Sequence, residues 1–202
     1  MEKEIESILA EKYKKRDSKL LRKLKMIVKD IVTSTYYRTR KHNNNIDYNS
    51  IKSITFLCYG NICRSPFCEY YLKKLIENKK QIEIYSAGFI MKEGRLSPEN
   101  AQKAAEKFKI DLSNHRSRTI TEQLAINSSI IIGMNYNNYV DFKRFFPAYA
   151  NKFYLLKSLV KPKKFILNIQ DPYGKSIDEF SKCYLDIKEN IDLIFDRRMK
   201  NK

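Results

Sequence analysis

The chain has 202 residues, of which 43% are hydrophobic and 31% charged, and it carries a formal net charge of +17. This hydrophobic fraction supplies a folded core and excludes a wholly disordered chain. The longest apolar run, Ile130–Met134, is far shorter than the about 20 residues that cross a bilayer.

The start of the chain and its cysteines indicate the compartment. The charged start Met1-Glu2-Lys3-Glu4 leads into no apolar stretch, so we expect no secretory signal. Four cysteines in a chain for which we expect no secretory signal indicate free thiols in a reducing compartment. We therefore expect a cytoplasmic protein.

The positive charge alone does not indicate a nucleic-acid partner. Residues 1–41 hold 13 basic and 6 acidic side chains, and no long block of one sign occurs. Lys, Asn and Ile are frequent throughout the chain, which is typical of a general compositional bias. We expect no binding to nucleic acid.

The first part of the chain differs from the rest. All five glycines and all five prolines, which mark turns and loops, lie beyond residue 59. Apolar residues recur at helical spacing over residues 20–32, with Ser18 as a candidate N-cap, and the polar run 42–45 is a candidate linker. We predict a basic helical extension with its linker over residues 1–48 and a second domain over residues 49–202.

The second domain alternates strands and helices. Short apolar, β-rich runs predict four strands: Ile54–Cys58, Gln81–Ser86, Ser129–Gly133 and Lys152–Leu156. Helix-opening signals occur at Ser65-Pro66, with Ser65 as the cap, at Ser97-Pro98-Glu99, whose helix runs to Phe108, and at the capping box Ser176-Ile177-Asp178-Glu179. This order predicts an α/β fold, a four-stranded parallel sheet with helices on both faces, preceded by the helical extension.

The loop between the first strand and the next helix carries the chemistry; it reads Cys58-Tyr59-Gly60-Asn61-Ile62-Cys63-Arg64-Ser65-Pro66. A glycine-containing loop before a helix N-terminus turns successive N–H groups toward one anion, and Arg64 adds a guanidinium that holds two phosphate oxygens. In such a field the pKa of a thiol falls from about 8.5 to roughly 3.5–7.5. Cys58 is therefore a candidate nucleophile for a phosphocysteine intermediate. The alternative is a small hydrophobic residue at the end of a buried strand.

Residues 54–66 resemble the phosphate-binding loop of the low-molecular-weight protein tyrosine phosphatases of bacterial type, which share a fold with the thioredoxin-coupled arsenate reductases. The resemblance extends in order from Ile51 to Arg198. It implies a phosphotyrosine phosphatase I-like fold and hydrolysis of phosphotyrosine without metal or cofactor, with Cys58 and Arg64 as catalytic residues. The implied phosphate-binding residues are Tyr59, Gly60, Asn61, Ile62, Cys63, Arg64 and Ser65.

Asp171-Pro172-Tyr173 resembles the family's general-acid motif near the C-terminus. An expelled phenolate needs a proton from a nearby group, and the resemblance gives that role to Asp171. Tyr59 and Tyr173 are the implied aromatic walls of the substrate site. Gly174 stands where the family often has a second aromatic residue, which predicts a more open rim.

Supporting residues are also implied by the resemblance: Ser86, His115 and Asn138. In the family the serine and the histidine belong to a hydrogen-bond network around the loop asparagine, here Asn61. Ser65 resembles the hydroxyl that stabilises the thiolate of Cys58. Met134-Asn135 replaces the family's usual Met-Asp, which leaves the contacts at that point open.

Relatives that share this loop leave three alternatives. An arsenate reductase needs two further cysteines in a mobile segment, where this chain has none. Protein-arginine phosphatases resemble a version of the loop with Thr in place of Ile62, whereas Ile favours a flat aryl ring. A phosphotyrosine-binding module without catalysis is the non-enzymatic alternative.

The resemblance implies a phosphotyrosine protein as substrate, and bacterial members of the family suggest a tyrosine kinase as that partner. Residues 1–41 are a candidate docking element for either an anionic membrane surface or a protein, so the periphery of the membrane is included in the expected location. Cys63 either packs beneath the loop or forms a reversible disulfide with an oxidised Cys58.

Overall fold

The computed structural model describes residues 21, 24–39, 46–47, 50–76, 82–160 and 165–199. The chain divides into two compact units, Met1–His42 and Asn43–Lys202. Among the helices in these described ranges, none combines the length and the apolar composition that a membrane-spanning segment requires.

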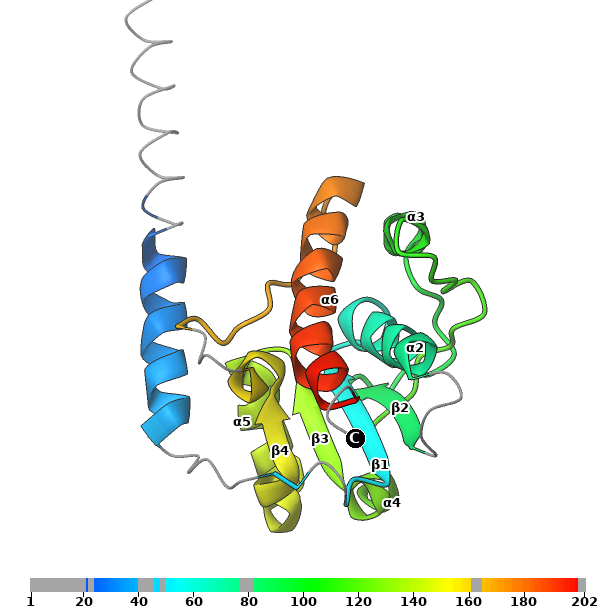
Figure 1. Cartoon of the computed structure of the whole chain (residues 1–202). Helices are drawn as coiled ribbons and strands as arrows, with labels where there is room; N and C mark the ends of the chain where they lie inside the picture. Colours follow the sequence, from blue (N-terminus) through cyan, green and yellow to red (C-terminus); the bar gives the residue numbers. More distant parts are fainter. Residues whose placement is uncertain are drawn as a thin grey trace, which may run out of the picture. The chain divides into compact units, whose positions relative to one another are not determined.

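The first unit contains a helix over residues 24–39 (Figure 1). Its side chains Leu24, Val28 and Val32 are exposed, and their spacing of four places them on one side of the helix. The predicted helix is present and continues beyond its expected end at Val32. The candidate cap Ser18 and the candidate linker 42–45 lie outside the described residues.

The second unit is built on a parallel sheet with the strand order β2-β1-β3-β4. Its strands are β1 (Ser53–Cys58), β2 (Glu83–Gly88), β3 (Ile130–Gly133) and β4 (Phe153–Leu155). The predicted four-stranded parallel sheet is therefore confirmed, although β2 begins and ends two residues later than expected.

The register places Cys58 at the carboxyl end of a central strand. Cys58 is paired with Gly88 of β2, while the preceding Leu57 is paired with Gly133 of β3. The next strand along the chain, β2, thus pairs with one edge of β1, and the strand after it, β3, pairs with the other edge. In open parallel sheets, ligands bind at the carboxyl ends of strands where the strand order reverses.

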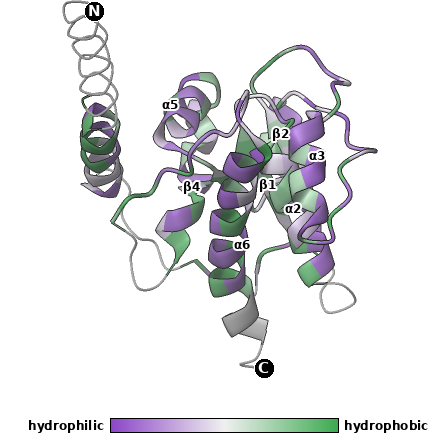
Figure 2. Ribbon diagram, turned by 90° about the horizontal axis from the view of Figure 1, so that it is seen from above, coloured by the Kyte–Doolittle hydropathy of each residue, from purple (hydrophilic) through white to green (hydrophobic). Residues whose placement is uncertain are grey.

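Helices cover both faces of the sheet, as predicted. They are α2 (Arg64–Leu75), α3 (Glu99–Glu106), α4 (Glu122–Asn127), α5 (Tyr136–Phe145) and α6 (Ile177–Met199), with the 3₁₀ helices η1 (Pro147–Lys152) and η2 (Leu156–Leu159). Figures 1 and 2 show α2, α3 and α6 on one face of the sheet and α5 on the other.

The core between the sheet and α2 and α6 fixes the position of the loop after β1. Ile54 and Phe56 of β1 are fully buried on this side. Phe67 of α2 stacks on Tyr184 of α6 with a ring-centroid distance of 4.0 Å. The start of α2 is therefore held between a buried strand and a buried helix.

The helix starts differ in detail from the prediction. The prediction of Ser65 as an N-cap is wrong: α2 begins at Arg64, and its N-cap Cys63 makes no side-chain capping bond. The Ser65 hydroxyl is instead directed at the sulfur of Cys58. At α6, Ser176 Oγ accepts from the backbone N–H of Glu179 at 3.4 Å, as in the predicted capping box.

The predicted helix after Ser97-Pro98-Glu99 is also present but shorter than expected. It ends at Glu106, two residues before Phe108. Lys109 follows with a φ of +58°, a left-handed backbone that no helix continues through.

Candidate active site

Cys58 lies at the bottom of a cavity of about 200 Å³ at the carboxyl end of β1. Its side chain is almost fully buried, and Ser65 Oγ donates a hydrogen bond to its sulfur at 3.1 Å. Other residues that line the cavity are Tyr59, Gly60, Ile62, Cys63, Arg64, Ile90, Arg95, Asp171 and Tyr173. The structure thus brings residues from three separate segments of the sequence into the lining of one cavity.

The backbone of the loop is held with its carbonyl groups outward. The bonds that hold it are Phe89 N to Tyr59 O (2.8 Å), Arg95 Nη2 to Gly60 O (2.6 Å), His115 Nε2 to Asn61 O (2.8 Å) and Tyr184 OH to Cys63 O (3.3 Å). The N–H and C=O groups of a trans peptide point in opposite directions. The N–H groups of these peptides are therefore turned toward the inside of the loop, an arrangement that binds anions.

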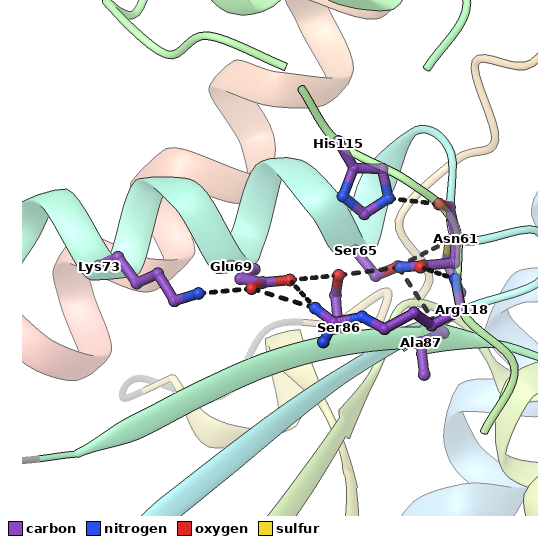
Figure 3. Close-up of polar contacts among 9 residues, drawn as sticks. Asn61, Ser65, Glu69, Lys73, Ser86, Ala87, His115 and Arg118 are labelled. Carbon is purple, nitrogen blue, oxygen red and sulfur yellow. Dashed lines mark hydrogen bonds and ion pairs between the residues drawn. The ribbon is translucent and has the colours of Figure 1, made fainter. Parts of the chain in front are cut away.

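Asn61 adopts a left-handed backbone with a φ of +51°, which costs free energy for a residue other than glycine. Its side chain compensates for this cost. Nδ2 donates to Ser65 Oγ at 3.0 Å and to Ser86 Oγ at 2.9 Å, while Oδ1 accepts from the backbone N–H of Arg118 at 2.8 Å. Together with the bond from His115 to the Asn61 carbonyl, these contacts hold both the side chain and the backbone of the residue (Figure 3).

Gly88 allows β2 to approach the loop closely. A Cβ atom at this position would lie 2.8 Å from Asn61 N and 2.8 Å from Tyr59 O. These are backbone atoms, so the loop itself would have to move. The absence of a side chain at Gly88 is therefore a requirement of the loop conformation.

Arg64 and Asp171 meet inside the cavity. Arg64 Nη2 donates to Asp171 Oδ2 at 2.6 Å, and Nη1 donates to the carbonyl of Ile169 at 3.1 Å. Arg64 is 2% exposed, and its Nε has no hydrogen-bond partner within the described ranges. A buried guanidinium of this kind is a donor for an anion beside Cys58.

The segment that carries Asp171 is shaped by two turns. Asp171 Oδ1 accepts from the N–H of Tyr173 at 3.2 Å, and Lys175 N donates to Pro172 O at 3.0 Å. In the second turn Gly174 has a φ of +74°, which favours glycine over an aromatic residue. Tyr173 is 65% exposed and lines the cavity together with the also exposed Tyr59.

Asn138 lies outside the network around Asn61. Its Oδ1 accepts from the N–H of Met134 at 3.1 Å, and its own N–H donates to Asn135 Oδ1 at 3.1 Å. Asn135 is the N-cap of α5, a position that Asn and Asp fill almost equally well. Asn135, which stands where the family usually has Asp, therefore still caps α5. The side chains of Asn135 and Asn138 both order the turn between β3 and α5.

Burial shifts the pKa of several groups near the site. Burial is the main cause that lowers the pKa of His115 below its ordinary value of 6.5, so the imidazole is neutral and donates through Nε2 to Asn61 O. Burial, helped by the neighbouring Cys58, raises the pKa of the Cys63 thiol far above the ordinary range. Cys183 on α6 has its pKa raised to about 12 by burial. Cys63 and Cys183 are thus protonated thiols at neutral pH.

Three residues around the loop were not identified from the sequence. They are Glu69, Arg95 and Arg118. Glu69 stands four residues after Ser65, so both lie on the same side of α2, and this spacing was the available signal. Across the described ranges, no group of three or more His, Cys, Asp or Glu residues has an arrangement that could hold a metal ion.

The sequence comparisons agree with this geometry. A relative from Acinetobacter johnsonii, described as low molecular weight protein-tyrosine-phosphatase Ptp, is 34% identical over 122 residues, which is 60% of this chain and 80% of the relative. A Bacillus subtilis relative described as a protein-arginine-phosphatase is 30% identical over 138 residues, 67% of this chain and 89% of the relative.

The fold and the family model give the same assignment. The crystal structure of the Erwinia amylovora tyrosine phosphatase AmsI is similar with a TM-score of 0.67 and 26% identity, covering 77% of this chain and 98% of that chain. The model of the family described as "Low molecular weight phosphotyrosine protein phosphatase" matches residues 53–202. The chain therefore belongs to the low molecular weight phosphotyrosine protein phosphatase family.

Proposed function

We propose that this protein hydrolyses phosphotyrosine in protein substrates through a phosphocysteine intermediate at Cys58. One observation carries the proposal: the sulfur of Cys58, the guanidinium of Arg64 and the carboxylate of Asp171 line the same cavity. A nucleophile, an anion-binding cation and a proton donor are the three groups that cysteine-based phosphate transfer requires.

In the first step the phosphate dianion binds to the backbone N–H groups of residues 59–65 and to Arg64. The thiolate of Cys58 attacks phosphorus in line, the sulfur–phosphorus bond forms and the bond to the tyrosine oxygen breaks. Asp171 gives its proton to the leaving oxygen, which departs as neutral tyrosine. The fixed N–H groups and Arg64 stabilise the negative charge on the equatorial oxygens.

In the second step a water molecule attacks the phosphorus of the phosphocysteine. Asp171, now a carboxylate, accepts the proton from this water. The sulfur–phosphorus bond breaks, inorganic phosphate leaves and the thiolate of Cys58 is restored. The Ser65 hydroxyl, 3.1 Å from the sulfur, stabilises the thiolate as the leaving group.

The preference for an aryl phosphate rests on the two exposed tyrosines. Tyr59 and Tyr173 line the cavity, and offset stacking between aromatic rings is favourable. Several relatives are described as protein-tyrosine-phosphatases, among them the one from Acinetobacter johnsonii. We propose phosphotyrosine proteins as substrates, with a bacterial tyrosine kinase as one such partner.

The test is hydrolysis of para-nitrophenyl phosphate by the full chain and by Cys58→Ser. We expect turnover by the full chain, no turnover by the variant, and equal thermal unfolding temperatures for both. A panel of phosphotyrosine, phosphoserine and phosphothreonine peptides then defines the substrate. Equal turnover by both proteins, or none by the full chain, would contradict the proposal.

A second candidate function is hydrolysis of phosphoarginine. It is favoured by the Bacillus subtilis relative described as a protein-arginine-phosphatase, of which this chain covers 89%. Against it stands Ile62, which lines the cavity and offers no polar group to a guanidinium. Comparing kcat/KM for phosphoarginine and phosphotyrosine peptides of the same sequence decides between the two.

We propose that residues 1–41 form a docking element and that the protein is cytoplasmic, where its four free thiols are stable. The exposed side chains Leu24, Val28 and Val32 support the docking role, as does the excess of basic residues. Flotation of the full chain with neutral and with anionic liposomes is the test. If the protein floats only with anionic liposomes, the docking element binds a membrane surface. If it floats with neither kind of liposome, the docking element binds a protein.

A further inference from the structure

Glu69 is a buried carboxylate that the proposed reaction does not use. It lies on α2, one turn after Ser65, and is 3% exposed. Lys73 Nζ lies 2.5 Å from Oε1, and Arg118 Nη2 lies 3.4 Å from both carboxylate oxygens. A buried charge is costly unless it is paired and hydrogen-bonded, and these two cations pair with the carboxylate of Glu69.

The Glu69 carboxylate determines which way the Ser86 hydroxyl points. Ser86 Oγ lies 2.5 Å from Glu69 Oε2, and a carboxylate only accepts hydrogen bonds. Ser86 must therefore use its single hydrogen on Glu69. Its oxygen is left to accept, and Asn61 Nδ2 donates to it at 2.9 Å (Figure 3).

The donor-to-acceptor direction of these hydrogen bonds continues through Asn61 and Ser65 to the sulfur of Cys58. The backbone N–H of Arg118 donates to Asn61 Oδ1 at 2.8 Å, so Asn61 presents its amide nitrogen to Ser86, and the same Nδ2 donates to Ser65 Oγ at 3.0 Å. Ser65 then accepts from Asn61, which leaves its own hydrogen to donate. The nearest acceptor is Cys58 Sγ at 3.1 Å, ahead of the carbonyl of Ala87 at 3.3 Å.

We propose that Glu69 is a positioning residue that, together with the backbone N–H of Arg118, sets the direction of the hydrogen bonds from Ser86 through Asn61 to Ser65, so that Ser65 donates to the sulfur of Cys58. This inference rests on the proposed function, because it concerns the nucleophile of that reaction. Glu69 itself touches neither the sulfur nor the cavity lining. Its effect is transmitted by three polar side chains that are each fully or almost fully buried.

The proposal and a simple charge effect predict opposite outcomes. Among the described residues, the Glu69 carboxylate bonds only to Lys73, Ser86 and Arg118. It therefore bonds to none of the charged or titratable groups that line the cavity or interact electrostatically with Cys58: Tyr59, Cys63, Arg64, Cys68, Arg95, Asp171, Tyr173, Cys183 and Tyr184. If Glu69 acted only through its negative charge, removing that charge would favour the thiolate. If it sets the hydrogen-bond direction, removing it weakens the bond from Ser65 and disfavours the thiolate.

Glu69→Gln is the variant that separates these outcomes. Lys73 and Arg118 attract the oxygen of the new side-chain amide, which turns its NH₂ group toward Ser86. Ser86 then meets two donors and its own hydrogen loses its acceptor, which weakens the bond from Asn61 Nδ2 and the hold of the network on Ser65. The control is Glu99→Gln on α3, which removes the same charge from a pair of the same i, i+4 spacing, with Lys103 as the exposed partner.

The measurement is the rate of iodoacetate alkylation of Cys58 as a function of pH in the full chain, with the modified residue identified by mass spectrometry. We expect the midpoint of the Glu69→Gln profile to rise by about one pH unit, since one unit corresponds to about 1.4 kcal/mol, a typical hydrogen bond. Glu99→Gln keeps the original midpoint. A midpoint that is unchanged or lowered in folded Glu69→Gln overturns the proposal.

Ser86→Ala keeps the test decisive if Glu69→Gln does not fold. It removes the transmitting hydroxyl with a small change of volume, and we expect a midpoint shift in the same direction. In the double variant the two effects are not additive, because Glu69 acts through Ser86. An unshifted Ser86→Ala profile, or full additivity, refutes the transmission. Alkylation requires no substrate, so these outcomes are independent of whether the protein hydrolyses phosphotyrosine.

Discussion

Arg64 and Asp171 are bonded to each other across the cavity, with 2.6 Å between guanidinium Nη2 and carboxylate Oδ2. In this pairing Asp171 Oδ2 faces the guanidinium of Arg64 rather than a leaving group. A phosphate dianion that binds the Arg64 guanidinium places its own negative charge beside Asp171. The substrate therefore competes with Asp171 for Arg64, which frees Asp171 to face the leaving oxygen in the proposed mechanism.

Asp171→Asn should lower kcat most for substrates with poor leaving groups. The amide cannot protonate the departing oxygen, and general acid catalysis typically contributes about 10²–10⁴-fold. A series of aryl phosphates of increasing phenol pKa measures this dependence. The control is Asp178→Asn on the exposed first turn of α6. Equal slowing for good and poor leaving groups would argue against the acid role.

Gly88→Ala should impair the loop more than the fold. The added Cβ meets the backbone of Asn61 and Tyr59 at 2.8 Å, and overpacking of this kind costs typically 1–3 kcal/mol. We expect strongly reduced kcat/KM for para-nitrophenyl phosphate and a modest fall in thermal stability.

Gly94→Ala is the comparison for Gly88→Ala. At Gly94 a Cβ has no neighbour within 4 Å, so that only the left-handed backbone with φ of +73° opposes the change. Its activity should remain closer to that of the unchanged chain. If the two variants lose activity equally, the close contact at Gly88 is not the cause.

The sequence patterns were informative where structure is decided locally. The strands β1 and β3 are short, β-rich and buried, so their composition alone predicts them. The helices α4 and α5 were not predicted, because α4 has only six residues and α5 has mixed polarity. The local signal that they do carry is a capping side chain at the start of each helix, Thr121 for α4 and Asn135 for α5.

The residues of the candidate site also fall into two groups, those that a local sequence motif predicts and those that only the structure reveals. Cys58, Arg64 and Asp171 stand in recognisable motifs, and the structure places them in one cavity. The contact of Arg95 with Gly60 O joins residues 35 positions apart, and no local spacing indicates it. A buried glutamate such as Glu69 is equally hidden, because glutamate on a helix is usually exposed.

Arg95→Met should weaken the binding of anions to the loop. Arg95 Nη2 donates to Gly60 O at 2.6 Å, and this bond holds one peptide of the loop with its N–H inward. Its loss should raise the inhibition constant of inorganic phosphate about tenfold, which corresponds to about 1.4 kcal/mol. The control is Arg116→Met, which removes the same charge from an exposed side chain that bonds Ser113 O and His115 O. Equal inhibition constants for both variants would indicate a long-range charge effect.

His115→Gln should reduce the loss of stability in acid. Because burial lowers the pKa of His115, the unfolded chain takes up a proton more readily than the folded protein. This contribution to stability is fully present above 6.5, the ordinary value, and is lost as the pH falls toward the lowered value of the folded state. Gln retains a donor for Asn61 O but does not titrate.

Urea midpoints measured at about pH 7 and about pH 5 test the role of His115. We expect the difference between the two midpoints to be smaller in His115→Gln than in the unchanged chain. Carboxylates contribute equally to both proteins and cancel in the comparison. If the urea midpoints of both proteins change equally with pH, His115 has the same pKa in the folded and unfolded states.

Ile62→Thr should shift the substrate preference toward phosphoarginine. Ile62 lines the cavity, and a hydroxyl at this position offers a hydrogen bond to a guanidinium that a methyl group does not. We expect the ratio of kcat/KM for phosphoarginine over phosphotyrosine peptides to rise about tenfold, or about 1.4 kcal/mol. Ile62→Val is the matched control, since Val has nearly the shape of Thr without the hydroxyl. If Val and Thr change the ratio equally, cavity volume rather than polarity selects the substrate at this position.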